Sequence, residues 1–198
     1  RTRVAVLSFL FNWPSTGGGI VHTVELCDFM KRAGYEVEHF FARYDPWELG
    51  VVKQSTPMKS HELFFHESDW NLQGIQERYR KALTTFQPDY VIVTDSWNMK
   101  PVLAEAVEQF PYLLRLQALE CLCPLNNIRL LPDGKGGLRQ CQLHQLATPD
   151  QCRECVRQNG QRSGSLHRDE RQLAGVDSQE YQERLKKVFR QAHAVLVV

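Results

Sequence analysis

The sequence predicts an α/β fold, a doubly wound, Rossmann-like parallel sheet with helices on both faces. Short apolar runs alternate along the 198 residues with stretches whose apolar side chains recur every three or four positions. A glycine turn joins the first apolar run to the first such stretch. Strand, turn, helix and strand in this order form βαβ units, and repeated βαβ units build a parallel sheet.

The first βαβ unit is expected over residues 4–41. Residues 4–11 are almost continuously apolar, which is typical of a strand buried on both faces of a parallel sheet. Residues 19–33 have the spacing of an amphipathic helix that ends at Gly34. Residues 36–41 are then the second strand, and the crossover between the strands should be right-handed.

The alternation continues to residue 117 and returns near the end of the chain. Between these parts, from residue 120 to about residue 175, no convincing period is visible, and we expect an irregular insertion. The other expected elements are strands at 61–66, 90–94, 112–117 and 195–198, and helices at 72–86, 101–110 and 178–192.

Composition excludes several classes of protein. Lysine and arginine number 24 against 23 aspartates and glutamates, so the net charge of +1 provides no field to attract nucleic acid. No apolar run reaches the roughly 18 residues of a transmembrane helix, and no secretory signal is recognisable. We therefore expect a cytoplasmic protein without a transmembrane segment or a nucleic-acid partner.

The glycine turn is a candidate anion site. Gly17, Gly18 and Gly19 follow the first strand and open the first helix, where backbone amides and the helix dipole favour a phosphate such as that of a nucleotide sugar. The turn lacks the Lys–Ser/Thr pair of a P-loop, and as a dinucleotide fingerprint it places His22 where a small residue is needed. A turn that binds no ligand is the alternative.

A second candidate site follows the strand at 90–94. Asp95, Ser96 and Trp97 lie just past its carboxyl end, where open α/β sheets bind ligands. The alternatives are that Ser96 only caps the next helix and that Trp97 only packs against its neighbours.

The cysteines provide the strongest local pattern. Cys152 and Cys155 form a C-x-x-C pair, and Cys123 and Cys141 would complete a tetrahedral Cys₄ site, with His144 or Cys121 as substitute ligands. Such a site would hold a structural zinc ion and leave no open position for catalysis; no catalytic metal is expected. Disulfides and free thiols are the alternatives.

These blocks together resemble the N-terminal domain of a GT-B glycosyltransferase of the large family 4. The first strand, its glycine turn and the helix end match the family's opening, and a later strand, a cysteine-bearing insertion and a closing element match further blocks. The matching segments are residues 4–11, Gly17–Gly19, Arg32–Val37, Pro88–Asp95, Cys123–Pro124, Cys141, Cys152–Cys155 and Phe189–Val198.

The resemblance implies one GT-B domain over residues 1–198, with its cysteine-bearing insertion at about 120–175. It implies retaining transfer of a sugar from a nucleotide-sugar donor to an acceptor hydroxyl on a glycan, lipid or small molecule. The C-terminal nucleotide-sugar-binding domain is absent from this chain, so the chain alone should be inactive. For the full-length protein, a membrane-peripheral position stays open.

Alignment on Cys123–Pro124 places Gln117 where the family commonly has a histidine near the reacting sugar. Gln117 can bind a hydroxyl but cannot transfer a proton at neutral pH. Gln117 and Glu120 are the candidate catalytic residues. The alternative functions are a non-enzymatic, zinc-stapled α/β binding module and a nucleotide-dependent oxidoreductase domain.

Overall fold

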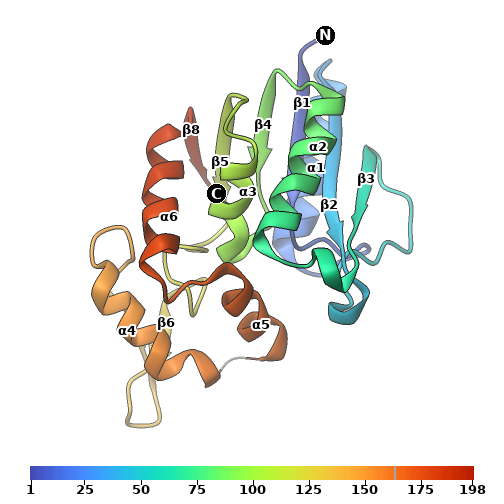
Figure 1. The fold of residues 1–198 in the computed structure, drawn as a ribbon. Coiled ribbons are helices and arrows are strands. Elements are labelled where there is room, and N and C mark those ends of the chain that lie inside the picture. The colour runs from blue at the N-terminus through green and yellow to red at the C-terminus, as the bar shows by residue number, and fades with distance from the viewer. Residues whose placement is uncertain (163) are drawn as a thin grey trace.

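A computed structural model describes residues 1–162 and 164–198 and confirms the α/β class. Its main sheet has six parallel strands in the order β3-β2-β1-β4-β5-β8 (Figure 1). The chain runs outward from β1 to β3, crosses back to β4 and continues the other way, as in a doubly wound fold. The strands are β1 (Arg3–Ser8), β2 (Glu36–Arg43), β3 (Lys59–Phe64), β4 (Tyr90–Val93), β5 (Tyr112–Leu116) and β8 (Ala194–Val197).

Helices cover both faces of the sheet because successive side chains of each strand point to opposite faces. Val4 and Val6 of β1 contribute to one core with Val24 and Cys27 of helix α1. Ala5 and Leu7 belong to the core on the other face, which the three remaining helices of the main fold cover (Figure 1). These helices are α1 (Gly18–Arg32), α2 (Leu72–Phe86), α3 (Lys100–Ala106) and α6 (Gln179–Gln191).

The first strand ends at Ser8, three residues earlier than the sequence predicts. The backbone amides of Phe9 and Leu10 both donate to the carbonyl of Asp95, at 3.1 and 2.9 Å. This pair of bonds turns the chain away from the sheet at the end of β4. Residues 9–11 are apolar because they are buried in the core beside the strands, not because they extend β1.

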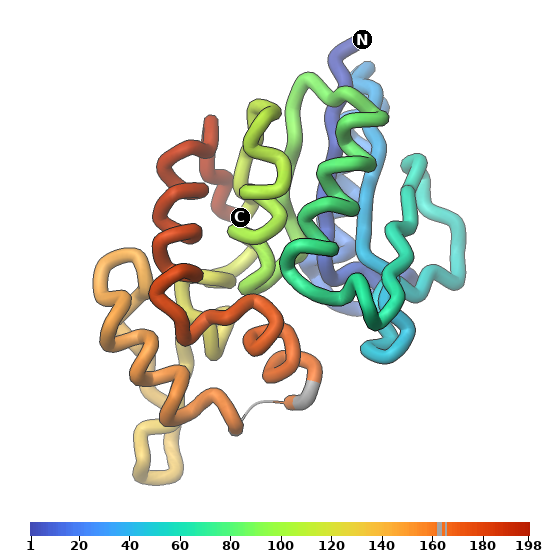
Figure 2. The backbone as a smooth tube through the Cα atoms, in the orientation of Figure 1, coloured from blue at the N-terminus to red at the C-terminus, as the bar shows by residue number. Residues whose placement is uncertain are grey.

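The expectation of an irregular segment from 120 to about 175 is wrong. The insertion forms two helices and a two-stranded hairpin, and it lies at the end of the molecule beyond the carboxyl ends of the strands (Figures 1 and 2). Two of its helix boundaries have recognisable signals in the sequence. Pro149 occupies the first turn of one helix, and Gly175, with φ of +69°, ends the other. The elements are β6 (Leu130–Pro132), β7 (Leu138–Gln140), α4 (Pro149–Asn159) and α5 (Ser165–Ala174).

The described residues also contain four single turns of 3-10 helix: η1 (Asp45–Trp47), η2 (Glu67–Asp69), η3 (Trp97–Met99) and η4 (Gly160–Arg162). Within the described residues, every helix is too short or too polar to cross a bilayer.

Candidate functional site

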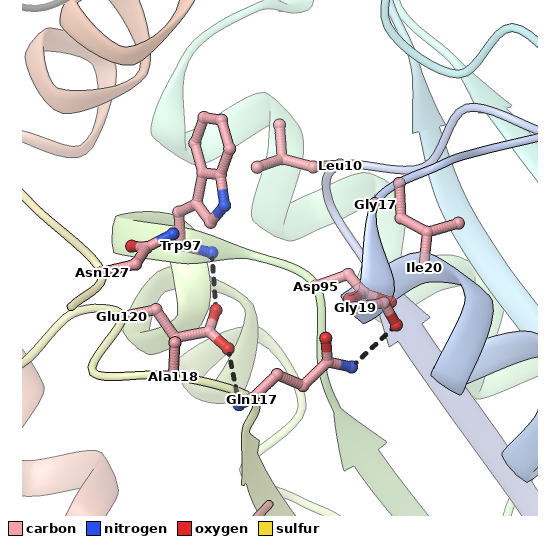
Figure 3. A pocket seen from close by; sticks show the side chains of 10 residues that line it. All are labelled: Leu10, Gly17, Gly19, Ile20, Asp95, Trp97, Gln117, Ala118, Glu120 and Asn127. Atoms are coloured by element: carbon pink, nitrogen blue, oxygen red, sulfur yellow. Dashed lines mark hydrogen bonds between the residues drawn. The ribbon is translucent and has the colours of Figure 1, made fainter.

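A cavity of about 260 Å³ opens at the carboxyl ends of β1, β4 and β5. This is the position where strand order reverses in the sheet, and open α/β sheets bind their ligands at such a point. Figure 3 shows side chains from the glycine turn, from the turn after β4 and from the turn after β5 around it. The lining residues are Leu10, Gly17, Gly19, Ile20, Asp95, Trp97, Gln117, Ala118, Glu120 and Asn127.

The glycine turn presents an uncapped helix end to this cavity. Gly17 is the N-cap of α1 and has no side chain that could bond the first turn, which also carries no acidic residue. The first helical hydrogen bond runs from the amide of Val21 to the carbonyl of Gly17, at 3.2 Å. No hydrogen bond among the described residues uses the amides of Gly18 and Gly19, so these donors and the positive end of the dipole are available.

The Gln117 side chain lies against the α-carbon of Gly19, so a larger residue at this position would displace it. A β-carbon at this position would collide with Gln117 Oε1 and would approach Asp95 Oδ1 to 3.0 Å. Gly18, by contrast, has open space where a side chain would be, and it does not line the cavity. Of the three glycines, Gly17 and Gly19 therefore form the wall and Gly18 contributes only its backbone.

The side chain of Gln117 is held in place through its carboxamide nitrogen, Nε2. Its Nε2 donates to the carbonyl of Gly19 at 3.0 Å, to Thr94 Oγ1 at 3.0 Å and to Thr23 Oγ1 at 3.2 Å. No hydrogen bond among the described residues reaches its Oε1. The side chain thus joins α1, β4 and β5 and has an acceptor left for a ligand hydroxyl.

Glu120 joins the two turns that form the floor of the cavity. Its Oε2 accepts from the amide of Trp97 and its Oε1 from the amide of Gln117, both at 3.1 Å (Figure 3). The ammonium group of Lys100, fully buried, lies 3.6 Å from the carboxylate and donates to the carbonyl of Arg115 at 2.9 Å. Both oxygens are engaged within the protein, which suits a positioning role better than contact with a substrate.

Asp95 lies at the end of β4 in a strained backbone conformation. Its φ is +29° and that of Trp97 is +42°, in a region that non-glycine residues rarely adopt and that is common at ligand sites. Burial raises the pKa of Asp95, while the hydrogen bond with Thr23 and the charge of Lys100 act in the opposite direction. Asp95 Oδ2 also accepts a 3.4 Å bond from Ser8 Oγ.

The turn after β4 is attached to the insertion. Trp97 stacks on His167 of α5, with ring centroids 3.7 Å apart. Glu170 of the same helix accepts from Asn98 Nδ2 at 3.1 Å and from the amide of Met99 at 3.0 Å. Helix α5 therefore fixes one wall of the cavity.

The predicted site residues are not all at the cavity. Ser96 is fully buried and does not line it, and its hydroxyl caps no helix and has no partner among the described residues. Sequence reasoning missed four lining residues, Leu10, Ile20, Ala118 and Asn127, and the two threonines that hold Gln117. Thr94 directly precedes Asp95 at the strand end, which was an available signal; Asn127 reaches the site only through the fold of the insertion.

The four cysteines proposed as a set surround one small cavity in the insertion. Cys123, Cys141, Cys152 and Cys155 line a space of about 30 Å³, while Cys121 belongs to a separate apolar cluster. All six cysteines are free thiols. Within the described residues, no group of three or more histidine, cysteine, aspartate or glutamate side chains has an arrangement that could hold a metal ion.

Burial is the main influence on the pKa of Cys123, Cys152 and Cys155, and neighbouring thiols raise each of these pKa values further. It raises the pKa of Cys123, and the Cys141 and Cys155 thiols raise it further. It likewise raises the pKa of Cys152, with added contributions from the other three cysteines of the set. The four sulfurs are thus mutually close in the fold although 32 residues separate the first from the last along the chain.

No protein-family model matches this chain, and no curated protein matches it. Among solved structures, the UDP-GlcNAc 2-epimerase from Methanocaldococcus jannaschii is similar, with 9% identity and a TM-score of 0.41. The similarity covers 60% of this chain and 32% of that one, so the matched part is less than two thirds of that protein's length. A similarity of this size carries no information about function.

Proposed function

We propose that this chain is the acceptor-side domain of a retaining glycosyltransferase and binds the sugar end of a nucleotide-sugar donor. The observation that carries the proposal is the cavity at the strand-order reversal, where an uncapped helix end and the open acceptor of Gln117 face the same space. The resemblance of the sequence to the family 4 enzymes supports the same assignment.

The two polar walls suit different parts of such a donor. The free amides of Gly18 and Gly19 and the helix dipole attract the phosphate next to the transferred sugar. Gln117 Oε1 accepts a hydrogen bond from a sugar hydroxyl. The cavity, at about 260 Å³, is below the roughly 300–1,000 Å³ of sites for drug-sized ligands, so a second domain must provide most of the nucleotide site.

Glu120 acts in this proposal by holding the backbone of Trp97 and Gln117 in place. Gln117 binds and orients the sugar without moving a proton, because a carboxamide does not titrate at neutral pH. We expect the chain taken alone not to catalyse transfer, because its cavity is too small for a whole nucleotide sugar.

The test uses the natural protein that contains this chain, incubated with a set of nucleotide sugars and followed by NMR for release of the nucleoside diphosphate. Gln117→Ala should lower kcat/KM about 5- to 10-fold or more, because one hydrogen bond contributes about 1 kcal/mol. Gln73→Ala is the matched control, since Gln73 is exposed on α2 and bonds only Glu77. Equal activity of Gln117→Ala and wild type would contradict the role of this residue.

This chain by itself and the natural protein that contains it together distinguish the alternative functions. Calorimetric titration with NAD and NADP should give no binding if the glycine turn holds a sugar phosphate rather than a dinucleotide. Binding of either cofactor by this chain alone would favour an oxidoreductase domain. Failure to bind or process any nucleotide sugar would favour a non-enzymatic binding module.

A further inference from the structure

The hairpin of the insertion has no core of its own. Strands β6 and β7 contain three residues each, and none of the six side chains is buried. An isolated two-stranded hairpin is marginally stable in water. The base of the hairpin, opposite its tip, adjoins the cysteine cavity. Cys141 directly follows β7, and its amide donates to the carbonyl of Arg129 at 2.8 Å.

Three separate segments meet at this cavity. Cys123 comes from the turn after β5, Cys141 from the end of the hairpin, and Cys152 and Cys155 from successive turns of α4. Residues three apart on a helix lie on the same face, so both α4 thiols are presented to one side. The structure therefore brings together the four cysteines that line this cavity, while Cys27 lies in the core beside α1.

Hydrogen-bond donors are directed at three of the sulfurs. Backbone hydrogen bonds from Leu125 and Asn126 reach the Cys123 thiol. Asn159 Nδ2 donates to Cys155 Sγ at 3.7 Å, and Thr148 Oγ1 lies 3.9 Å from Cys152 Sγ. Donors of this kind stabilise sulfur that carries negative charge and hold metal ligands in position.

The remaining wall of the cavity is mostly apolar, from Pro124, Leu125, Leu131 and Leu143, with Gln151 as its one polar residue besides the cysteines. Its volume of about 30 Å³ is near that of one water molecule and leaves no space for an organic ligand. Four thiols around an ion-sized space are the donor set of a closed tetrahedral zinc site.

We propose that Cys123, Cys141, Cys152 and Cys155 bind one structural zinc ion that joins the hairpin, α4 and the turn after β5. Each cysteine has one side-chain torsion with three staggered positions, and the proposed site requires these torsions to turn the four thiols toward a common centre. On binding, four thiols release four protons and the zinc ion accepts four sulfur electron pairs. The guanidinium of Arg139 acts on Cys155 and offsets part of the resulting negative charge.

The zinc ion replaces the apolar core that the hairpin lacks. Its loss should therefore release the hairpin while the main sheet remains folded, because the sheet has its own cores on both faces. Lys135, at the tip of the hairpin between two glycines with positive φ, should then become a site of rapid cleavage by trypsin.

The first measurement is the metal content of the wild-type protein, purified without chelators. About one zinc ion per chain is expected, and cobalt exchanged into the site should show the intense absorption of a tetrahedral thiolate complex. Less than about half an equivalent of zinc together with a cobalt spectrum lacking those bands would overturn the proposal. A disulfide between any two of the four cysteines, found by mass spectrometry of the freshly purified protein, would overturn it as well.

Variants then assign the ligands. Cys141→Ser and Cys155→Ser should lose the cobalt bands, whereas Cys27→Ala should retain them because Cys27 lies in the other core. His144→Ala should also retain them, since His144 does not line the cavity. If the serine variants fail to fold, the wild-type protein still decides the question: chelation must speed trypsin cleavage at Lys135 while the circular dichroism of the main fold persists. Unchanged cleavage after chelation would contradict the structural role.

Discussion

At the scale of single residues, the site depends on buried polar groups that fix backbone turns. Glu120 and Glu170 each hold a turn at the end of β4, the first from β5 and the second from the insertion. Lys100 compensates the charge of Glu120. The charge of Glu170 is avoided by protonation instead. Burial raises its pKa to about 8, against the smaller opposing effects of hydrogen bonds from Asn98 and the charge of Arg171.

The raised pKa of Glu170 predicts how stability depends on pH. The folded protein keeps a proton up to about pH 8 that the unfolded chain releases near pH 4.5. The contribution of Glu170 to the free energy of unfolding is therefore complete below pH 4.5. It is lost as the pH rises to about 8, and the free energy of unfolding falls by at most about 1.4 kcal/mol per pH unit over this range. Urea denaturation at a series of pH values should show this decline in wild type and a flatter profile in Glu170→Gln.

Glu183→Gln is the control for that experiment, because Glu183 is exposed on α6 and should leave the profile unchanged. Identical profiles for wild type and Glu170→Gln would show that Glu170 does not retain its proton in the folded protein.

At the scale of elements, the contact between α5 and the turn after β4 connects the insertion to the candidate site. His167→Ala removes the ring stacked on Trp97 and should cost about 0.5–1.5 kcal/mol of stability. Trp97 would gain exposure to water, so the tryptophan emission should shift to longer wavelength. Denaturant titration followed by fluorescence measures both effects.

His22→Ala provides the comparison, since His22 is exposed on α1 and stacks on no ring among the described residues. An unchanged emission spectrum in His167→Ala would mean that α5 does not shield Trp97 in solution.

At the scale of the whole molecule, the two edges of the sheet differ. Strand β3 carries charged and polar side chains, including Lys59 and Glu62, whereas β8 exposes Val195, Leu196 and Val197, the last at 74%. An apolar strand at a sheet edge pairs readily with other chains. We therefore expect this chain to self-associate, and Val197→Lys should reduce the association without changing the unfolding midpoint.

Sedimentation velocity over a range of protein concentrations measures this effect. Gln73→Lys adds the same charge on exposed α2 and should leave association as in wild type. If both lysine variants reduce association equally, net charge and not the β8 edge is responsible.

The main fold was predictable because its signals are local. A strand buried on both faces, such as β1, is apolar over its central residues 4–7, and a helix such as 72–86 repeats its apolar residues with the helical period. The insertion was not predictable in this way. Its helices are short and polar, and their few buried residues, such as Val156 and Ala174, join the main core instead of forming a stripe of their own.

Residues of the candidate site were predictable only where they directly follow a strand in the sequence. Gly19, Asp95, Trp97, Gln117 and Glu120 follow strands in the sequence and lie together because parallel strands end at one edge of the sheet. The contacts between these residues, which determine their roles, could not be predicted from the sequence. The close approach of Gln117 to Gly19 joins positions 98 residues apart, and no local pattern encodes a contact of that kind.

The sequence by itself determined the α/β class and the order of the main strands along the chain, since periodicity records these features directly. It also grouped Cys123, Cys141, Cys152 and Cys155 by spacing, with Cys121 and His144 left as substitutes. Only the tertiary structure decided which acceptor of Gln117 stays open, that both oxygens of Glu120 are engaged, and that Cys121 and His144 lie away from the cysteine cavity. The physical reason is that hydrogen bonding and burial depend on distances between segments, and those distances exist only after the sheet has assembled.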